Sequence, residues 1–559
     1  WYDGVDSDCD GAEEPSVCDS VPGPSTVATD SACTASFGTS WTVSTEWTTD
    51  STSYTYDTAD NYTEVMATPA VGNLTDDNGD GAIDHGDIPD VAFSTFKGSG
   101  YSSAGYLRVV SGDTGEEITT ISAATVGSSS YSVGGTSSVA LGDLEGDGSP
   151  DIIAVSTGGD ILAFEADGST KWVYDTSKSQ YIAPFIADMD GDGLAEVTAG
   201  TTILDAYGTL VSTCTAFSDG YYGLAADINA DGQLDLVAGD GACELDGTVL
   251  FTSTRTTGFA AVGEFDGDPE LEVVNADRSN DRVDLLDDNG TLLWSTGISG
   301  GGGGPPVVGD FDGDGALDIG VGGASRFTVL EADGTLKWRV TIDDSSSESC
   351  GATAFDFDAD GALEIVYADE GDLYVFDGAS GSTLYTTTSH ASGTLREEPV
   401  VVDVDRDGQA EIVLASNDYA FSGWDGIHVL GAADGEWPSA RNHFNQHAYL
   451  VDTWDDDLQV TDPAIPWTDW SMTRGQKGYT SDPAAVADLE VTILGTCADC
   501  DAGTATVYAI VDNTGLVFAP AGVTVSLYAV SGASETLLGS ETLATPLEPG
   551  DRTAPIEFA

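Results

Sequence analysis

Positively charged residues are scarce in this chain of 559 residues. It has 16 Lys and Arg against 96 Asp and Glu, which leaves a formal net charge of −80 at pH 7. Nucleic acids and anionic membrane surfaces are bound by clustered Lys and Arg, so we expect neither as a partner. The chain also lacks an apolar run long enough to span a bilayer, so we expect no membrane insertion.

Cysteine is limited to an even set of eight, and no zinc-spaced Cys-x-x-Cys pairs or Cys-x-x-Cys-His haem motif occur. An even count is typical of an oxidising compartment, which predicts a secreted protein, extracellular or at the cell surface. The chain begins at Trp1 without a signal peptide, so we expect a processed product or a fragment. Proximity suggests three bridges and leaves a fourth pair: Cys9–Cys18, Cys214–Cys243, Cys497–Cys500 and Cys33–Cys350.

Helical periodicity is also hard to find. Short apolar runs rich in Val, Ile, Leu and Tyr alternate with Gly and Asp clusters, and the chain has 69 Gly. Forty per cent of the residues are hydrophobic, which is enough to bury real cores. The composition therefore predicts a folded all-β protein with many tight turns.

One pattern recurs eight times: an apolar run, an acidic loop of the form D-x-D-x-D-G-x-x-D/E, and a second apolar run. The clearest copy is VVGDFDGDGALDIGVGG, residues 307–323. Calcium takes six to eight oxygen ligands, and alternate residues of a tight loop aim their side chains inward to supply them. The candidate metal ligands are, loop by loop, Asp76, Asn78, Asp80, Asp84 and Asp87; Asp143, Glu145, Asp147 and Asp151; Asp188, Asp190, Asp192 and Glu196; Asp227, Asn229, Asp231 and Asp235; Glu264, Asp266, Asp268 and Glu272; Asp310, Asp312, Asp314 and Asp318; Asp356, Asp358, Asp360 and Glu364; and Asp403, Asp405, Asp407 and Glu411.

Two of the eight loops depart from this pattern. The first is longer and aligns with a twelve-residue EF-hand loop, in which Asp84 takes position 9 and Asp87 replaces the usual Glu at position 12. The fifth has Pro269 at the position where the other loops have Gly. The fixed φ of proline does not suit that turn, so we expect a distorted or weak site there.

The loop spacing predicts the architecture. The first ligands of successive loops lie 37 to 67 residues apart, which is the size of a four-stranded propeller blade. Each unit is expected to run strand, calcium loop, strand, strand, tight turn, strand, with Asp-Gly, Asn-Gly or Ser-Gly at the tight turn. Trp172, Trp294 and Trp338 take matching positions just after that turn, where we expect them to pack one blade against another.

These repeats resemble the FG-GAP (or VCBS) calcium loops of integrin α-chain propellers and of many secreted bacterial proteins. The resemblance covers about residues 35–455 and implies several bound Ca²⁺ ions. Integrin heads resemble a seven-bladed ring, so seven blades are an alternative, but eight loops favour eight blades. The segment 38–49 precedes the first blade and is expected to close the ring by pairing with the last blade, which lacks an obvious outer strand.

The flanking segments read differently. Residues 1–34 form an acidic arm whose start resembles a secreted D-x-D-C-D-G metal motif, with Asp3, Asp6, Asp8 and Asp10 as candidate ligands and a plain acidic linker as the equal alternative. After the propeller we expect a linker over 456–487. Residues 488–559 resemble an incomplete CARDB group Ig-like β-sandwich with five strands.

The segment that follows the last blade contains two histidines four residues apart, His443 and His447. On a helix they could share one face and bind a transition metal. We expect them instead to form hydrogen bonds within a structural cap, and the absence of His-Glu-x-x-His excludes a zincin.

Catalytic motifs are missing elsewhere too. The sequence has no Gly-x-Ser-x-Gly, and its glycine-rich run at 297–306 is not followed by the Lys-Ser/Thr of a phosphate loop. We therefore expect no enzyme, but an extracellular structural or adhesive protein, with a self-assembling surface filament as one form. Its partners would be copies of itself, joined head to tail by strand donation, or surface glycans and proteins. The alternative is a carbohydrate-binding or lyase-like polysaccharide-processing propeller.

Overall fold

The chain divides into two compact units, Gly38–Gly478 and a second unit made of Trp1–Phe37 with Tyr479–Ala559. The computed structural model describes residues 41–49, 62–79, 81–176, 178–218, 222–433, 437–461 and 472–476 in the first unit, and 489–499, 504–513, 523–531, 534–543, 553 and 556–558 in the second. The predicted metal ligands Asp3, Asp6, Asp8 and Asp10 therefore lie outside the described residues, as do the pairs Cys9–Cys18 and Cys497–Cys500 as bridges.

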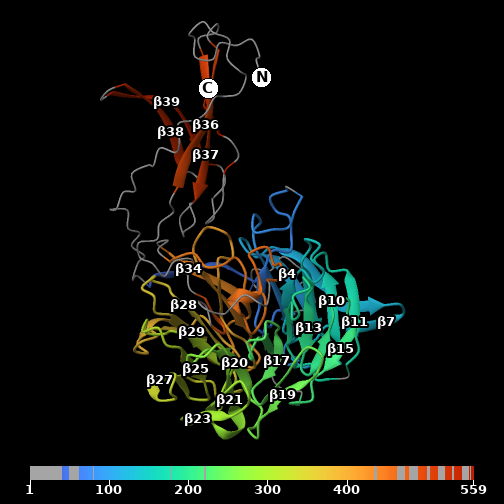
Figure 1. Ribbon diagram of the computed structural model, residues 1–559. Coiled ribbons are helices and arrows are strands. Elements are labelled where there is room, and N and C mark those ends of the chain that lie inside the picture. Colours follow the sequence, from blue (N-terminus) through green and yellow to red (C-terminus); the bar gives the residue numbers. More distant parts are fainter. Residues whose placement is uncertain are drawn as a thin grey trace. The chain divides into compact units, whose positions relative to one another are not determined.

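The first unit is an eight-bladed β-propeller, as the eight loops predicted (Figure 1). Blades 1 to 4 consist of β2 (Ala70–Gly72), β3 (Asp90–Thr95), β4 (Tyr106–Ser111) and β5 (Glu117–Ile121); β8 (Ala140–Gly142), β9 (Asp151–Val155), β10 (Ile161–Glu165) and β11 (Thr170–Tyr174); β12 (Pro184–Ala187), β13 (Glu196–Ala199), β14 (Thr202–Leu204) and β15 (Leu210–Thr213); and β16 (Leu224–Ala226), β17 (Asp235–Ala238), β18 (Gly241–Cys243) and β19 (Val249–Thr252).

Blades 5 to 8 consist of β20 (Phe259–Gly263), β21 (Glu272–Asp277), β22 (Arg282–Leu286) and β23 (Leu292–Gly297); β24 (Val307–Gly309), β25 (Asp318–Gly322), β26 (Arg326–Leu330) and β27 (Leu336–Thr341); β28 (Ala352–Phe355), β29 (Glu364–Ala368), β30 (Leu373–Phe376) and β31 (Thr383–Thr387); and β32 (Val400–Val402), β33 (Glu411–Ser416), β34 (Gly426–Ala432) and β1 (Val43–Thr48). Smaller elements are the hairpin β6 (Ala123–Val126) with β7 (Ser129–Ser132), and the 3₁₀ turns η2 (Arg278–Asn280) and η3 (Val451–Thr453).

Burial falls from the inside of each blade to its outside. The innermost strands, such as β8 and β24, are buried at every residue, whereas the outermost strands, such as β15 and β23, are largely exposed. This gradient explains the sequence: continuous apolar runs precede each loop, and Thr, Ser and Lys alternate with apolar residues after each tight turn. Among the described residues, no helix is long and apolar enough to cross a membrane.

The ring is closed by the N-terminal strand. Strand β1 pairs antiparallel with β34 and supplies the outer strand of blade 8. The predicted closure by residues 38–49 is therefore confirmed. It joins the two ends of the propeller through main-chain hydrogen bonds.

The predicted packing of tryptophans between blades is also found. The indole N–H of Trp172 donates to the carbonyl of Ala206 in the next blade at 2.9 Å, and that of Trp294 donates to Ala332 at 2.8 Å. Trp338 bonds Gly378 of blade 7 in the same way. Trp47 of β1, which we did not single out, makes the equivalent bond to blade 1 and so belongs to the same set.

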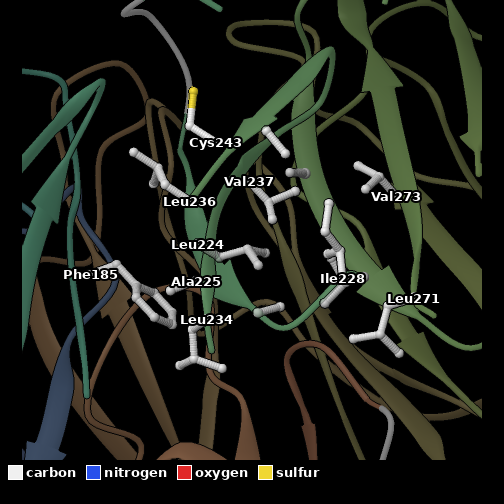
Figure 2. Close-up of a cluster of buried hydrophobic side chains, with 14 of the residues drawn as sticks. Phe185, Leu224, Ala225, Ile228, Leu234, Leu236, Val237, Cys243, Leu271 and Val273 are labelled. Carbon is white, nitrogen blue, oxygen red and sulfur yellow. The ribbon is translucent and has the colours of Figure 1, made fainter. Parts of the chain in front are cut away.

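Apolar side chains fill the space between neighbouring blades (Figure 2). In the cluster drawn there, Leu224 and Leu236 of blade 4 lie between Phe185 of blade 3 and Val273 of blade 5. The same cluster includes Ala448 from the segment after the last blade. That segment is therefore part of the propeller core.

The chain after blade 8 contacts the innermost strands around the ring axis. The carbonyls of Phe444 and Asn445 accept hydrogen bonds from Val71 of β2 and Leu141 of β8. Residues 472–476, which we predicted as linker, include the short strand β35 (Gly475–Gln476), which pairs with β28. The linker prediction over 456–487 is corrected to this extent: contacts hold its residues 456–461 and 472–476 in the propeller, where Leu458 packs into the core and Arg474 is fully buried. We call residues 438–458 and 472–476 the axial plug.

The second unit contains the five predicted strands. Strands β36 (Leu489–Asp499), β37 (Thr504–Asn513) and β40 (Ile556–Phe558) form one sheet, and β38 (Thr524–Ser531) pairs with β39 (Ser534–Thr542). A small core includes Val511, Val525 and Phe558. The assignment of this unit as an Ig-like sandwich stays a prediction.

One of the predicted disulfides is present among the described residues. Cys214 and Cys243 are bridged and tie the outer strand region of blade 3 to blade 4. Cys350 is a buried free cysteine, so the leftover pairing Cys33–Cys350 is wrong. Closeness in the sequence correctly predicted the bridge between Cys214 and Cys243. The pair Cys33–Cys350 was assigned only because these two cysteines remained, without any evidence that they lie close in space.

Candidate metal sites

The first acid of each loop organises the backbone around it. In the third loop, Asp188 accepts hydrogen bonds from Gly191 N and Gly193 N, both at 2.8 Å. Those glycines have φ of +77° and +84°, the left-handed conformation that glycine adopts without strain. Seven loops repeat the bond from the residue at position 6 to the first acid: Gly81, Gly148, Gly193, Gly232, Gly315, Gly361 and Gly408 are the donors.

The acid at position 9 begins the second strand and is buried. One of its oxygens accepts the backbone N–H of position 2, as Glu196 does from Met189 at 2.9 Å. The other oxygen is aimed into the loop: Glu272 Oε1 and Asp235 Oδ2 are buried and accept no hydrogen bond from the described residues. A bound cation would supply the partner that these oxygens lack.

Burial raises the pKa of these ninth-position acids, and neighbouring loop carboxylates add to the effect. The pKa of Glu196 is raised to about 8 and that of Glu364 to about 9. A carboxylate that is desolvated and surrounded by like charges is unstable in its ionised form without a cation. The donor set and its electrostatics therefore fit a hard divalent ion such as Ca²⁺.

Several predicted ligand sets do come together. Carboxylate oxygens lie within 4.8 Å of one another in at least four loops, among them Asp188, Asp190 and Glu196; Glu264, Asp266 and Glu272; Asp310, Asp312 and Asp318; and Asp356, Asp358 and Asp360. In the remaining loops, Asp143, Asp227 and Asp403 hold the same place at position 1 and accept the N–H of position 6. Occupation of these loops by Ca²⁺ stays a prediction.

The first loop requires a different ligand assignment. Asp90, which we did not predict, begins β3 and accepts the N–H of Leu74 at 3.0 Å, as the ninth-position acids do in other loops. Burial raises its pKa to about 7. Asp84 lies instead beside His85 and Asp457, and Asp87 accepts three backbone N–H groups of the loop. Asp90 follows Leu74 by sixteen residues, whereas Asp151 follows the equivalent Leu144 by seven, so nine extra residues displace Asp90 from the register of the other loops. Its place at the start of an apolar strand was a usable signal.

The predicted ligand Asp80 of the first loop lies outside the described residues. The fifth loop can be compared with the structure. Pro269 has no N–H, so the fifth loop lacks the bond from position 6 to its first acid, Glu264. Glu264 is instead bonded by Gly267 N at 2.5 Å. The local difference has the expected cause, and weak metal binding there stays a prediction.

The two histidines lie in the axial plug and face different neighbours. His443 Nδ1 is 3.1 Å from Asn442 Oδ1, and the ring packs against Tyr449. The ring of His447 packs on Tyr222 with centroids 4.3 Å apart, and neither of its buried ring nitrogens has a hydrogen-bond partner among the described residues. The expected hydrogen bonding is therefore found for His443 but not for His447. Burial lowers the pKa of both well below the usual histidine range.

A match to a known repeat family agrees with this geometry. The profile of the FG-GAP-like repeat family matches residues 356–414, which include loop 7 and loop 8. The chain contains an FG-GAP-like repeat. Comparison with curated protein sequences finds no match.

Comparison with solved structures finds similar proteins. The crystal structure of the biofilm matrix protein Bap1 of V. cholerae is similar with a TM-score of 0.68 and 20% identity, covering 78% of this chain and 99% of that chain. A rhamnogalacturonan lyase of Bacillus licheniformis is similar with a TM-score of 0.47 and 16% identity, covering 75% and 78%. At these identities the likeness to Bap1 shows the eight-bladed fold alone.

Proposed function

We propose that this chain is an extracellular structural or adhesive protein, not an enzyme, whose propeller is stabilised by several Ca²⁺ ions. The observation that carries the proposal is the set of eight acidic loops, which bury ninth-position carboxylates such as Glu272 and Glu364 in one propeller. These groups need a cation, and loops of this ligand type suit the calcium levels outside cells.

The loops are linked to one another around the ring. Ala195 N of loop 3 donates to Leu144 O of loop 2, and Leu234 N of loop 4 donates to Met189 O of loop 3. Neutralising one loop therefore also orders its neighbour. Metal binding of this kind adds directly to the stability of the folded state.

The ring axis also suits a structural role. Within the axial plug, Arg474 donates to Glu398, and both side chains are fully buried. Arg474 also donates to the carbonyls of Ala260 and Pro306 in blades 5 and 6. The polar groups at the axis thus hold the blades together. The fold likeness to a biofilm matrix protein fits a role in an extracellular matrix.

The test combines stability with location. Differential scanning calorimetry in Ca²⁺, in Mg²⁺ and in excess chelator is expected to give a melting temperature many degrees higher in Ca²⁺. Immunogold electron microscopy of producing cells is expected to place the chain in extracellular material. A melting temperature that chelator leaves unchanged, or labelling confined to the cell interior, would contradict the proposal.

Carbohydrate binding is the second candidate. Opposite the loops, where the innermost strands begin, the Arg396 guanidinium lies over the ring of the buried Tyr222 at 4.8 Å and over the half-buried ring of Tyr181, the one open to a ligand, at 5.9 Å. Tyr101 and the exposed Tyr419 pair edge to face on the same side, at 5.1 Å. Aromatic faces beside a guanidinium suit stacking on sugar rings and pairing with a sugar carboxylate. Binding on a glycan array that Arg396→Ala and Tyr419→Ala both abolish would favour this candidate.

The partner that we propose is another copy of this chain. Among the described residues, strand β40 pairs with β37 on one side only and so lies at the edge of its sheet. An exposed edge strand can receive a strand from another chain, and repeated head-to-tail donation gives a filament. Electron microscopy of the purified protein in Ca²⁺ is expected to show linear arrays. Single particles at all concentrations would contradict this part.

A further inference from the structure

The outer strand of every blade has a β-bulge at the same place. In each blade the strand pairing skips one residue of the outer strand. This residue directly precedes the position that Trp172, Trp294, Trp338 and Trp47 occupy in their blades, which we call the wedge position. The skipped residues in blades 1 to 8 are Ile118, Lys171, Val211, Leu250, Leu293, Lys337, Leu384 and Glu46. A bulge re-aims a side chain relative to the regular alternation of a strand. Five of these residues are apolar and the one in blade 8 is Glu46, but in blades 2 and 6 the bulge residue is lysine.

In blade 2 the lysine side chain reaches the acidic loop. Lys171 Nζ lies 2.9 and 3.0 Å from the two oxygens of Asp151, the ninth-position acid. It also contacts Glu145 at position 3 of the loop, and Glu165 at 3.4 Å. The side chain of Lys171 is only 11% exposed, so these carboxylates replace much of its hydration shell.

Blade 6 repeats this arrangement. Lys337 Nζ lies 3.2 and 3.0 Å from the two oxygens of Asp318, again the ninth-position acid, and 2.5 Å from Asp312 at position 3. Glu331 completes the set at 3.2 Å. Two blades that are far apart in the sequence therefore place an ammonium on the same two loop positions.

The ammonium uses the oxygens that a metal would need. Calcium bound in such a loop would be held by carboxylates of the same positions, at about 2.3–2.6 Å for the oxygens that coordinate it directly. A lysine within hydrogen-bond distance of the same oxygens leaves no room for that ion and repels it.

Blade 4 provides the matched comparison. Its ninth-position acid is also aspartate, Asp235, but its bulge residue is Leu250. Asp235 Oδ2 is buried and accepts no hydrogen bond from the described residues, in contrast to the oxygens of Asp151 and Asp318. With the same kind of acid at position 9, blades 2 and 6 place a lysine ammonium on that acid and blade 4 does not.

We propose that the bulge residue decides how each loop is neutralised: in blades 2 and 6 the chain's own lysine takes the place of calcium, and the loops of the other six blades take up calcium from solution. The second half rests on the proposed function. The first half adds that Lys171 and Lys337 determine which loops of this propeller are metal sites.

The test is the calcium stoichiometry of the full chain, measured by elemental analysis after equilibrium dialysis against Ca²⁺. The wild type is expected to bind at most six ions per chain. Lys171→Leu and Lys337→Leu are each expected to add one ion, and Leu250→Lys to remove one. Lys178→Leu is the control: Lys178 donates to Thr201, away from the loops, and its replacement is expected to change nothing.

A second readout protects the test against loss of folding. Without calcium, Lys171→Leu and Lys337→Leu are expected to melt below the wild type, and calcium is expected to restore them by a larger shift than it gives the wild type. Unchanged stoichiometry in both variants, with the wild type already binding eight ions, would overturn the proposal and leave calcium binding intact. A wild type that binds no calcium would overturn the proposed function itself.

Discussion

Removing Arg474 from the axial plug should destabilise the propeller strongly. The guanidinium and the Glu398 carboxylate are both fully buried, 3.2 Å apart, and Arg474 also bonds three carbonyls. Removing one partner of a buried ion pair costs about 3–5 kcal/mol, because the other charge stays buried without compensation. We therefore expect Arg474→Met to lower the free energy of unfolding by about this amount.

The size of the propeller converts that cost into a temperature. The unit Gly38–Gly478 has about 440 residues, which corresponds to an unfolding entropy of about 0.9 kcal/mol per kelvin if it unfolds as one body. The melting temperature should therefore fall by about 3–5 °C. The measurement is differential scanning calorimetry in saturating Ca²⁺, with Arg339→Met as the control, because Arg339 is on an outer strand and its guanidinium bonds only Thr328 among the described residues.

The pH dependence gives a sharper check. Burial raises the pKa of Glu398 to about 7, although Arg474 pulls it down. Without Arg474 the folded-state pKa should rise further, so folding favours protonated Glu398 more strongly. The loss of unfolding free energy in Arg474→Met should then become smaller as pH falls toward the unfolded pKa of Glu, about 4.3. Adding Glu398→Gln to Arg474→Met should restore part of the lost stability at neutral pH. A variant as stable as Arg339→Met, or a deficit that Glu398→Gln does not relieve, would refute the reasoning.

Three further predictions concern other parts of the propeller. In excess chelator, the free energy of unfolding should fall as pH rises from about 4.3 toward 9, because burial raises the pKa of Glu364 to about 9 and folding favours its protonated form. In Ca²⁺, the melting temperature should depend much less on pH. An equal pH dependence in chelator and in Ca²⁺ would contradict this prediction. Replacing Cys214 and Cys243 by serine opens a bridge of sequence separation 29 and should cost about 3–4 kcal/mol in urea unfolding, while Cys350 stays protected from thiol reagents until the protein unfolds. Trp338→Ala should lower the free energy of unfolding by about 3–5 kcal/mol. Trp338→Phe keeps much of the packing but loses the hydrogen bond to Gly378, so it should lower the free energy of unfolding clearly less. Equal losses in calorimetry would count against packing of Trp338 between blades.

Features encoded within one repeat could be predicted from the sequence. The acidic loops, the order of strands in each blade and the places of Trp172 and Trp294 recur at a regular spacing, and local turn chemistry determines them. The blade count followed from the number of loops. Closure by residues 38–49 followed as well, because the last blade was one strand short and one unused strand pattern remained.

Only the tertiary structure decided the contacts between distant segments. It placed Asp90 at the ninth position of loop 1 because the strand register, not the loop alignment, determines which acid faces inward. It brought Lys171 and Lys337 onto their loops through a bulge that no residue pattern marks. It also buried Arg474 at the ring axis, since the innermost strands of several blades have to be present before that site exists.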